Sequence, residues 1–248
     1  MHEEIPVKIT FLGTGAFSHT QNRANQSIMI EHDDCKFLVD CGPTTLLRIH
    51  QLNLDLSELS GIFITHFHGD HTFGLPQLDL SLTLDCHRKT PFFYLGPVGL
   101  QQYFYDLYNL AYPDFLPNHQ FERKFEEYLP NQKYIWSNIS VTTFPMKHKK
   151  ESLGFVFQIG TKKIAVSGDA GWSEQYCNFT KDTDLAICEC VSYHPVSNGK
   201  HMSYEEFLEY EPLLQTKKLI LSHIGQSIAD NIEHLKFTIA QEGSTLIL

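Results

Sequence analysis

The sequence has few charged residues, no Cys-x-x-Cys pair and no long apolar run. Charged residues make up 19% of its 248 positions, a low share that argues against long disordered tails. Its six cysteines, at positions 35, 41, 86, 177, 188 and 190, include no Cys-x-x-Cys pair. We therefore expect buried thiols rather than a disulfide framework.

A long apolar segment that could cross a membrane and an excess of basic residues are also missing. No apolar run approaches the ~20 residues that cross a bilayer. The start, Met1-His2-Glu3-Glu4, lacks the basic-then-apolar order of a signal peptide. We expect a cytoplasmic protein. The net charge is −10, so the totals do not indicate a basic groove for long nucleic acids. An anionic substrate would need bound cations to supply local positive charge.

The apolar content and its patterning predict an α/β fold. Apolar residues make up 42% of the chain, enough for the core of one large domain, and we treat residues 1–248 as a single domain. Strands are expected over 7–12, 26–30, 36–40, 60–65, 139–144, 154–159, 163–167, 184–188, 219–222 and 245–248. Helices are expected over 44–52, much of 96–128, 204–210 and a stretch before Gly243. The aromatic residues of 96–128 are assigned to core packing and one wall of a pocket. Strands in both halves with helices between them favour two packed sheets.

One short motif concentrates metal-binding side chains, His66-x-His68-x-Asp70-His71, directly after an apolar strand. Residues two apart in an extended chain point to the same side, so His66 and His68 can face one ion. Gly69 permits a sharp bend, after which Asp70 and His71 can face a second ion. These polar groups are costly to desolvate without partners. A metal site explains the motif better than chance does.

Three more candidate ligands follow other predicted strands, namely His148, Asp169 and His223. Loops at strand ends are where binding groups collect. Imidazole and carboxylate suit zinc and, with less discrimination, manganese or iron. The histidines assigned to surface or packing roles are 2, 32, 50, 87, 119 and 234, and those assigned to exposed loops are 19 and 194.

This ordered set of side chains resembles the metallo-β-lactamase superfamily over nearly the whole chain. The resemblance implies a four-layer αβ/βα sandwich that holds two divalent metal ions between its sheets, with zinc favoured over manganese or iron. The implied ligands are His66, His68 and His148 for one ion, Asp70, His71 and His223 for the other, and Asp169 as the bridge between them.

Further motifs resemble the ribonuclease Z group within that superfamily. They are Phe11-Leu12-Gly13-Thr14-Gly15, Arg23-x-x-Gln26-Ser27, Asp40-Cys41-Gly42, Glu189 and His201-Met202-Ser203. One departure concerns the interval after His148, because Asp169 follows only 21 positions later. Ribonuclease Z carries its tRNA-gripping arm there. The short interval looks like the small-molecule phosphodiesterase of the carbon–phosphorus lyase pathway, whose cysteine-rich zinc site is not evident here.

We therefore predict a metal-dependent hydrolase of a small anionic phosphodiester or cyclic-nucleotide-like substrate, with no membrane partner and no long nucleic acid. Asp70 would also steer the proton of the nucleophile. His201 would bind a phosphate oxygen or protonate the leaving group, and Glu189 would either orient His201 or be a surface carboxylate. Two alternatives stay open: hydrolysis of a lactone, aryl sulfate or thioester, and a non-hydrolytic metal-dependent biosynthetic role. The oligomeric state is open, and a homodimer is compatible with the sequence.

Overall fold

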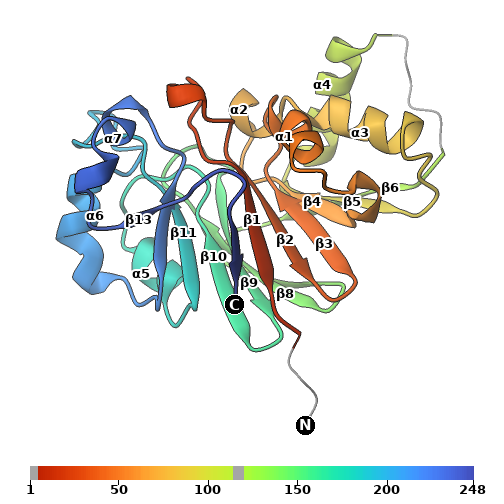
Figure 1. Ribbon diagram of the computed structural model, residues 1–248. Helices are drawn as coiled ribbons and strands as arrows, with labels where there is room; N and C mark the ends of the chain where they lie inside the picture. The colour runs from red at the N-terminus through yellow and green to blue at the C-terminus, as the bar shows by residue number, and fades with distance from the viewer. Residues whose placement is uncertain (1–4, 114–119) are drawn as a thin grey trace.

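Two seven-stranded sheets pack face to face, with helices on both outer faces (Figure 1). The computed structural model describes residues 5–113 and 120–248. This arrangement confirms the α/β class and the predicted four-layer sandwich, since each sheet has one face on the shared core and one face under helices.

The first sheet combines an antiparallel N-terminal part with a parallel part. Its strands, in spatial order, are β14 (Thr245–Ile247), β1 (Lys8–Gly13), β2 (Ser27–His32), β3 (Cys35–Val39), β4 (Gly61–Phe63), β5 (Phe92–Pro97) and β6 (Arg123–Tyr128). Strands β3 to β6 run parallel. The helices in this half are α1 (Thr45–Gln51), α2 (Gly69–Thr72), α3 (Leu75–Leu84) and α4 (Leu100–Ala111).

The second sheet has the same combination in the other half of the chain. Its strands, in spatial order, are β13 (Thr238–Ile239), β12 (Leu219–Ser222), β11 (Leu185–Glu189), β10 (Lys162–Val166), β9 (Leu153–Ile159), β8 (Ile139–Pro145) and β7 (Lys133–Trp136). Strands β10 to β13 run parallel. Its helices are α5 (Gln175–Thr180), α6 (Tyr204–Tyr210) and α7 (Gln226–Ala229).

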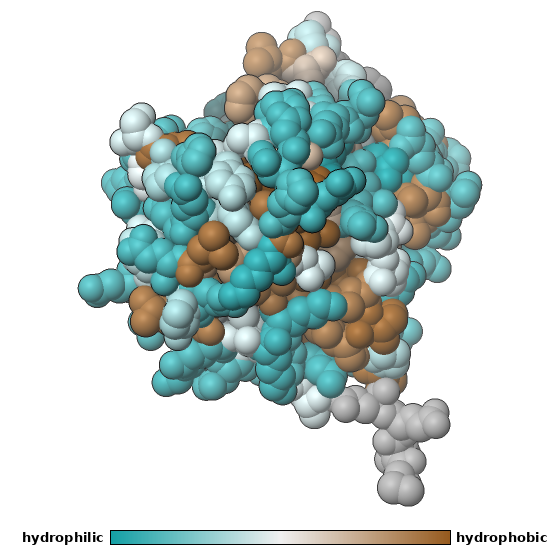
Figure 2. Space-filling view, turned by 60° about the vertical axis from the view of Figure 1, so that its left-hand side comes forward, coloured by the Kyte–Doolittle hydropathy of each residue, from teal (hydrophilic) through white to brown (hydrophobic). Residues whose placement is uncertain are grey.

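Alternating side chains divide the apolar residues between two kinds of core. Along β3, Phe37 and Val39 face the core between the sheets, whereas Leu38 faces the helices outside. The rings of Phe37 and Phe157 meet across the sheets with centroids 5.1 Å apart. Figure 2 shows a mainly hydrophilic surface on the side of α6 and α7, with apolar side chains gathered low on that face.

Several local predictions are confirmed and others are wrong. The helix over 204–210 and the strand patterns from β8 to β12 are present, and four of the six cysteines are buried. The helical prediction for 96–128 is wrong at its end, because 123–128 forms the edge strand β6, and 114–119 lie outside the described residues. Instead of a long helix before Gly243 the chain forms α7, a short 3-10 turn and β13. None of the described helices combines the length and apolar character needed to span a bilayer.

A buried ion pair fastens helix α3 to the edge of the first sheet. The carboxylate of Asp79 is fully buried and accepts from Arg123 Nε at 2.7 Å and Nη2 at 2.8 Å. The hydroxyl of Tyr94 donates to the same carboxylate at 2.7 Å. These bonds hold α3 at the edge of the sheet. Removal of either charged partner would leave the other buried and unpaired, which is costly.

We expect Asp79→Ala to lower the free energy of unfolding by about 3–5 kcal/mol, because Arg123 would keep a buried charge without a partner. Denaturant unfolding measures the loss. Asp85→Ala, at the exposed end of the same helix, is the control and should cost less than ~1 kcal/mol. Equal effects of the two substitutions would contradict a structural role for the ion pair.

Candidate metal centre

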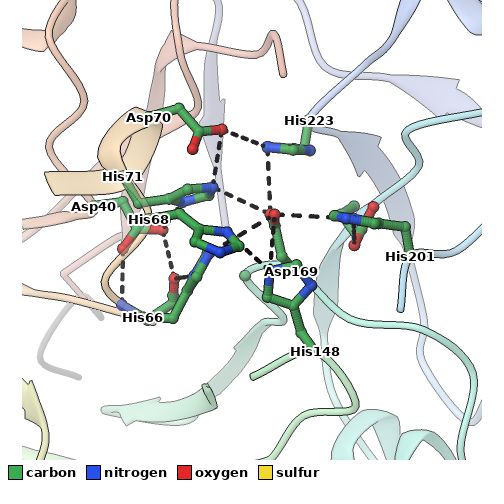
Figure 3. Close-up of polar contacts among 12 residues, drawn as sticks. Asp40, His66, His68, Asp70, His71, His148, Asp169, His201 and His223 are labelled. Atoms are coloured by element: carbon green, nitrogen blue, oxygen red, sulfur yellow. Dashed lines mark hydrogen bonds and ion pairs between the residues drawn. The ribbon is translucent and has the colours of Figure 1, made fainter. Parts of the chain in front are cut away.

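The candidate ligands come together where parallel strands of both sheets end. His66, His68, Asp70 and His71 lie between the end of β4 and the end of α2. The other three follow strands of the second sheet: His148 after β8, Asp169 after β10 and His223 after β12. Strands β10 and β12 run parallel, and β8 points the same way because β8 and β10 are both antiparallel to β9. The carboxyl ends of these strands therefore lie at one edge, where rigid sheets hold the loops. Figure 3 shows the side chains converging on the carboxylate of Asp169.

The seven side chains form two groups that meet at Asp169. His66, His68, His148 and Asp169 make one group, and Asp70, His71 and His223 make the other. In each group the potential ligand atoms lie within 4.8 Å of one another. Asp169 Oδ2 is 3.8 Å from Nε2 of both His66 and His148. Its other oxygen, Oδ1, is 3.2 Å from His71 Nε2 and 3.3 Å from His223 Nε2.

Several atoms that face this centre are buried without hydrogen-bond partners, namely His66 Nε2, His71 Nε2 and Asp169 Oδ1. Buried polar atoms are rarely left unpaired. Two ligand atoms that bind one zinc ion tetrahedrally lie about 3.4 Å apart, close to the separations found around Asp169. The donor chemistry and the unpaired atoms therefore fit divalent metal ions in both groups.

Hydrogen bonds on the far side of the rings aim the Nε2 lone pairs at the centre. The hydroxyl of Thr65 donates to Asp40 Oδ2 at 2.9 Å, so it accepts from His66 Nδ1 at 3.0 Å. Asp40 Oδ2 also accepts from His71 Nδ1 at 2.8 Å. His148 Nδ1 donates to the carbonyl of Lys200 at 3.1 Å. Each bond holds a proton on Nδ1 and directs Nε2 towards the centre, where Nε2 of His148 lies 3.0 Å from His68 Nδ1, as expected for histidines that share a metal.

Left-handed backbone conformation at Asp40 and Gly168 lets the loops around the centre approach one another closely. Asp40 has φ of 63°, the left-handed region that few residues other than Asn, Asp and Gly adopt readily. Gly168, before the shared aspartate, has φ of 60°, and an added Cβ would lie 2.6 Å from Cβ of Thr65. Only glycine lets the loop after β10 approach the loop after β4 this closely.

Burial and the surrounding charges divide the histidines into two electrostatic classes. Burial lowers the pKa of His66 well below its ordinary value and that of His148 to about 4. Burial acts in the same direction on His71 and His223, but nearby carboxylates together outweigh it and raise both pKa values: Asp169 and Asp40 for His71, and Asp169, Asp70 and Glu189 for His223. Metal binding needs neutral imidazole, so it must displace protons from the second pair.

His201 and Glu189 form a separate pair beside the shared aspartate. His201 Nδ1 donates to Glu189 Oε1 at 2.8 Å, and the same oxygen accepts from the backbone N–H of Ala170 at 2.6 Å. Glu189 is fully buried, so the alternative of a surface carboxylate is wrong. Burial raises the pKa of Glu189 to about 7, and the glutamate raises the pKa of His201. With Nδ1 engaged, Nε2 of His201 remains for other partners.

The structure leaves the other histidines away from the centre and adds groups that the motifs did not mark. The His194 side chain is 75% exposed and pairs with Glu205, and His19 is exposed. His2 and His119 lie outside the described residues. Thr65 and the carbonyl of Lys200 were not predicted to take part. Asp40 was noted only in a motif, although a carboxylate at a strand end is a signal that could have marked it.

Comparison with known proteins agrees with this geometry. The family described as "Anti-Pycsar protein Apyc1" matches residues 7–245. A ribonuclease Z of Methanococcus maripaludis is 35% identical over 155 residues, which cover 61% of the chain but only 49% of that relative. A ribonuclease Z of Clostridium perfringens is 25% identical over 92% of both chains.

A solved structure shares the fold at low sequence identity. It is the metallo-β-lactamase fold protein YhfI from Bacillus subtilis, with a TM-score of 0.82, 18% identity, and coverage of 99% of this chain and 100% of that one. The chain therefore belongs to the family described as Anti-Pycsar protein Apyc1, is similar in sequence to ribonucleases Z and shares the metallo-β-lactamase fold.

Proposed function

We propose that the chain hydrolyses a small phosphodiester at a centre of two divalent metal ions, with zinc as the favoured metal. The observation that carries the proposal is the shared carboxylate: both oxygens of Asp169 lie among histidine nitrogens, Oδ1 on one side and Oδ2 on the other. One carboxylate between two ligand groups is what a pair of ions a few ångströms apart requires. Similarity to curated ribonucleases Z supports a phosphodiester as the substrate.

The bound ions would be held by His66, His68 and His148 on one side and by Asp70, His71 and His223 on the other, with Asp169 between them. Two such ions supply an acidified water and positive charge for the phosphate oxygens. The residues of the chain orient this chemistry. Asp40 and the Thr65 hydroxyl hold two of the imidazoles in the tautomer that binds metal. Asp70 is 15% exposed, so it can also accept a hydrogen bond from the attacking water.

His201 is the proposed contact to the leaving group or to a phosphate oxygen. Its side chain is 22% exposed, and its Nδ1 is 3.9 Å from Asp169 Oδ2. Glu189 fixes the ring by accepting a hydrogen bond from Nδ1–H, so Nε2 is the atom that would meet the substrate. A raised pKa favours the protonated imidazole, which is the form that donates a proton.

We predict about two metal ions per chain, measured by elemental analysis after purification without added metal. Asp169→Ala should lose most of this metal because it removes an oxygen from both groups. Glu189→Gln is the control: it keeps the shape of a neighbouring buried side chain and should keep two ions. Loss of metal from Glu189→Gln would instead make Glu189 a ligand. A content near zero that zinc or manganese does not restore would contradict the metal centre.

We predict turnover of bis(p-nitrophenyl) phosphate, and little turnover of a lactone, an aryl sulfate or a thioester under the same conditions. A metal pair around a shared carboxylate stabilises charge on a phosphodiester more than on a neutral lactone or thioester, and the aryl sulfate, a monoanion like the phosphodiester, tests selectivity for phosphorus. The panel should include a precursor tRNA. We expect poor cleavage of it because the chain has 19 Lys and Arg against 29 Asp and Glu, and tRNA binding depends on phosphate contacts. Efficient 3′ trimming of the precursor tRNA, or faster turnover of another ester class, would contradict the proposal of a small phosphodiester as the substrate.

We predict that His201→Ala slows an alkyl phosphodiester by ~10²–10⁴-fold and its p-nitrophenyl counterpart far less. An alkoxide needs a proton to leave, whereas p-nitrophenolate leaves almost unaided. The kcat/KM of both substrates and the metal content measure the effect, and His194→Ala in the same loop is the control. Equal losses on the two substrates would assign His201 to phosphate binding rather than proton donation.

A further inference from the structure

Tyr103 of helix α4 packs against the loop that carries His68. The helix is held on the first sheet, because its side chains Phe104 and Tyr108 are buried in the core. The Tyr103 ring stacks on the ring of Phe67, with centroids 4.6 Å apart and planes 13° from parallel. Tyr103 therefore connects a firmly packed helix to the residue that directly precedes a candidate ligand.

Two hydroxyl groups hold the backbone of this loop. The Tyr103 hydroxyl donates to the carbonyl of Phe67 at 3.0 Å, and the hydroxyl of Thr72 donates to the carbonyl of His68 at 2.8 Å. The two hydroxyl oxygens also lie 2.8 Å apart, within hydrogen-bond distance of each other. Two hydroxyl protons thus serve three short contacts, which makes the pair one hydrogen-bonded unit. We call Tyr103 and Thr72 the hydroxyl bridge.

The hydroxyl bridge binds both peptide groups that adjoin the α-carbon of His68. The carbonyl of Phe67 belongs to the peptide before it, and the carbonyl of His68 belongs to the peptide after it. Because peptide units are planar, only the two torsions of His68 lie between them. These torsions are φ −68° and ψ 149°, an extended conformation directly before α2. The bridge therefore restrains the direction in which the His68 side chain leaves the backbone.

The His68 ring depends on this restraint more than the rings that share its group. The Nδ1 atoms of His66 and His148 are held by hydrogen bonds to the Thr65 hydroxyl and the Lys200 carbonyl. His68 instead turns its Nδ1 towards the centre, 3.0 Å from His148 Nε2 (Figure 3). Its far nitrogen, Nε2, makes no hydrogen bond within the described part of the chain. The direction of this ring is therefore set by its backbone.

We propose that the hydroxyl bridge positions His68 and thereby sets the affinity of the centre for the ion that His66, His68 and His148 would hold. The inference rests on the proposed function, because it needs the metal centre, but it does not depend on the substrate. Tyr103 and Thr72 are positioning residues, since they act through His68. Groups that orient a metal ligand typically contribute about 10–100-fold to metal affinity.

Tyr103→Phe tests the proposal, because it keeps a ring on Phe67 and removes only the hydroxyl. Zinc titration of metal-free protein against a competing chelator gives the dissociation constants of the two ions. We expect one of the two constants to rise about tenfold and the other to stay unchanged. The kcat for bis(p-nitrophenyl) phosphate should fall at stoichiometric zinc and recover in excess zinc, which a general loss of structure would not allow.

Tyr105→Phe is the matched control, since Tyr105 lies on the same helix and its hydroxyl makes no hydrogen bond within residues 5–113 and 120–248. It should leave both zinc constants unchanged. Thr72→Val removes the other hydroxyl of the bridge and should raise the same constant as Tyr103→Phe. Thr72→Ser keeps a hydroxyl and should bind zinc like the wild type. The double variant Tyr103→Phe/Thr72→Val should lose less affinity than two independent losses would give, because linked groups are not additive.

Four results would overturn the proposal: unchanged constants in Tyr103→Phe, an equal change in Tyr105→Phe, an equal rise of both constants, or fully independent losses in the double variant. In each case turnover of bis(p-nitrophenyl) phosphate by the zinc-loaded wild type would still support the proposed function. Zinc binding without turnover would reject the proposed substrate class, and the zinc constants would still decide the role of Tyr103. A wild type that binds no zinc would overturn both proposals.

Discussion

The site depends on one carboxylate, Asp169, which is only 3% exposed and has four imidazoles within 3.8 Å of its oxygens. A buried negative charge is costly unless positive charge and hydrogen bonds compensate it. The same electrostatic attraction raises the pKa values of His71 and His223, against the effect of their burial. Divalent ions held at the proposed centre would supply positive charge at the same place. Ion binding and proton release would then be coupled, and affinity for metal would rise with pH as the imidazoles become neutral.

The two sheets bring the candidate ligands together around Asp169, and the loops at the strand ends place the individual side chains. Strands β8, β10 and β12 point the same way, which brings three loops of the second sheet to the same edge as the loop after β4. His223 and Asp40 both have positive φ, of 53° and 63°. Conformations of this kind persist only where the surroundings hold them. For Asp40 the surroundings are visible: bonds to the Thr65 N–H, the Thr65 hydroxyl and His71 fix both of its oxygens.

The sequence alone marked the seven candidate ligands, because potential metal ligands follow the predicted strands and four of them have short, regular spacing. The spacing of His66, His68, Asp70 and His71 reflects extended chain followed by a bend, which local geometry dictates. What escaped prediction was set by tertiary contacts. The carbonyl of Lys200 reaches His148 from 52 positions away, and Glu189 becomes buried only through packing of its strand. Strand β6 escaped because Arg123-Lys124-Phe125-Glu126-Glu127-Tyr128 is an edge strand with little apolar alternation.

The distribution of charge around the centre also reflects the cost of burying a carboxylate without a compensating partner. Carboxylates that serve the centre lie inside it or directly behind it, as Asp40, Asp70, Asp169 and Glu189 do, and each of them has a histidine within reach. Divalent ions held at the proposed centre would add positive charge where these carboxylates meet the partly exposed side chains of Asp70 and His201. A protein with a net charge of −10 could therefore bind an anion at this centre without a broadly basic surface.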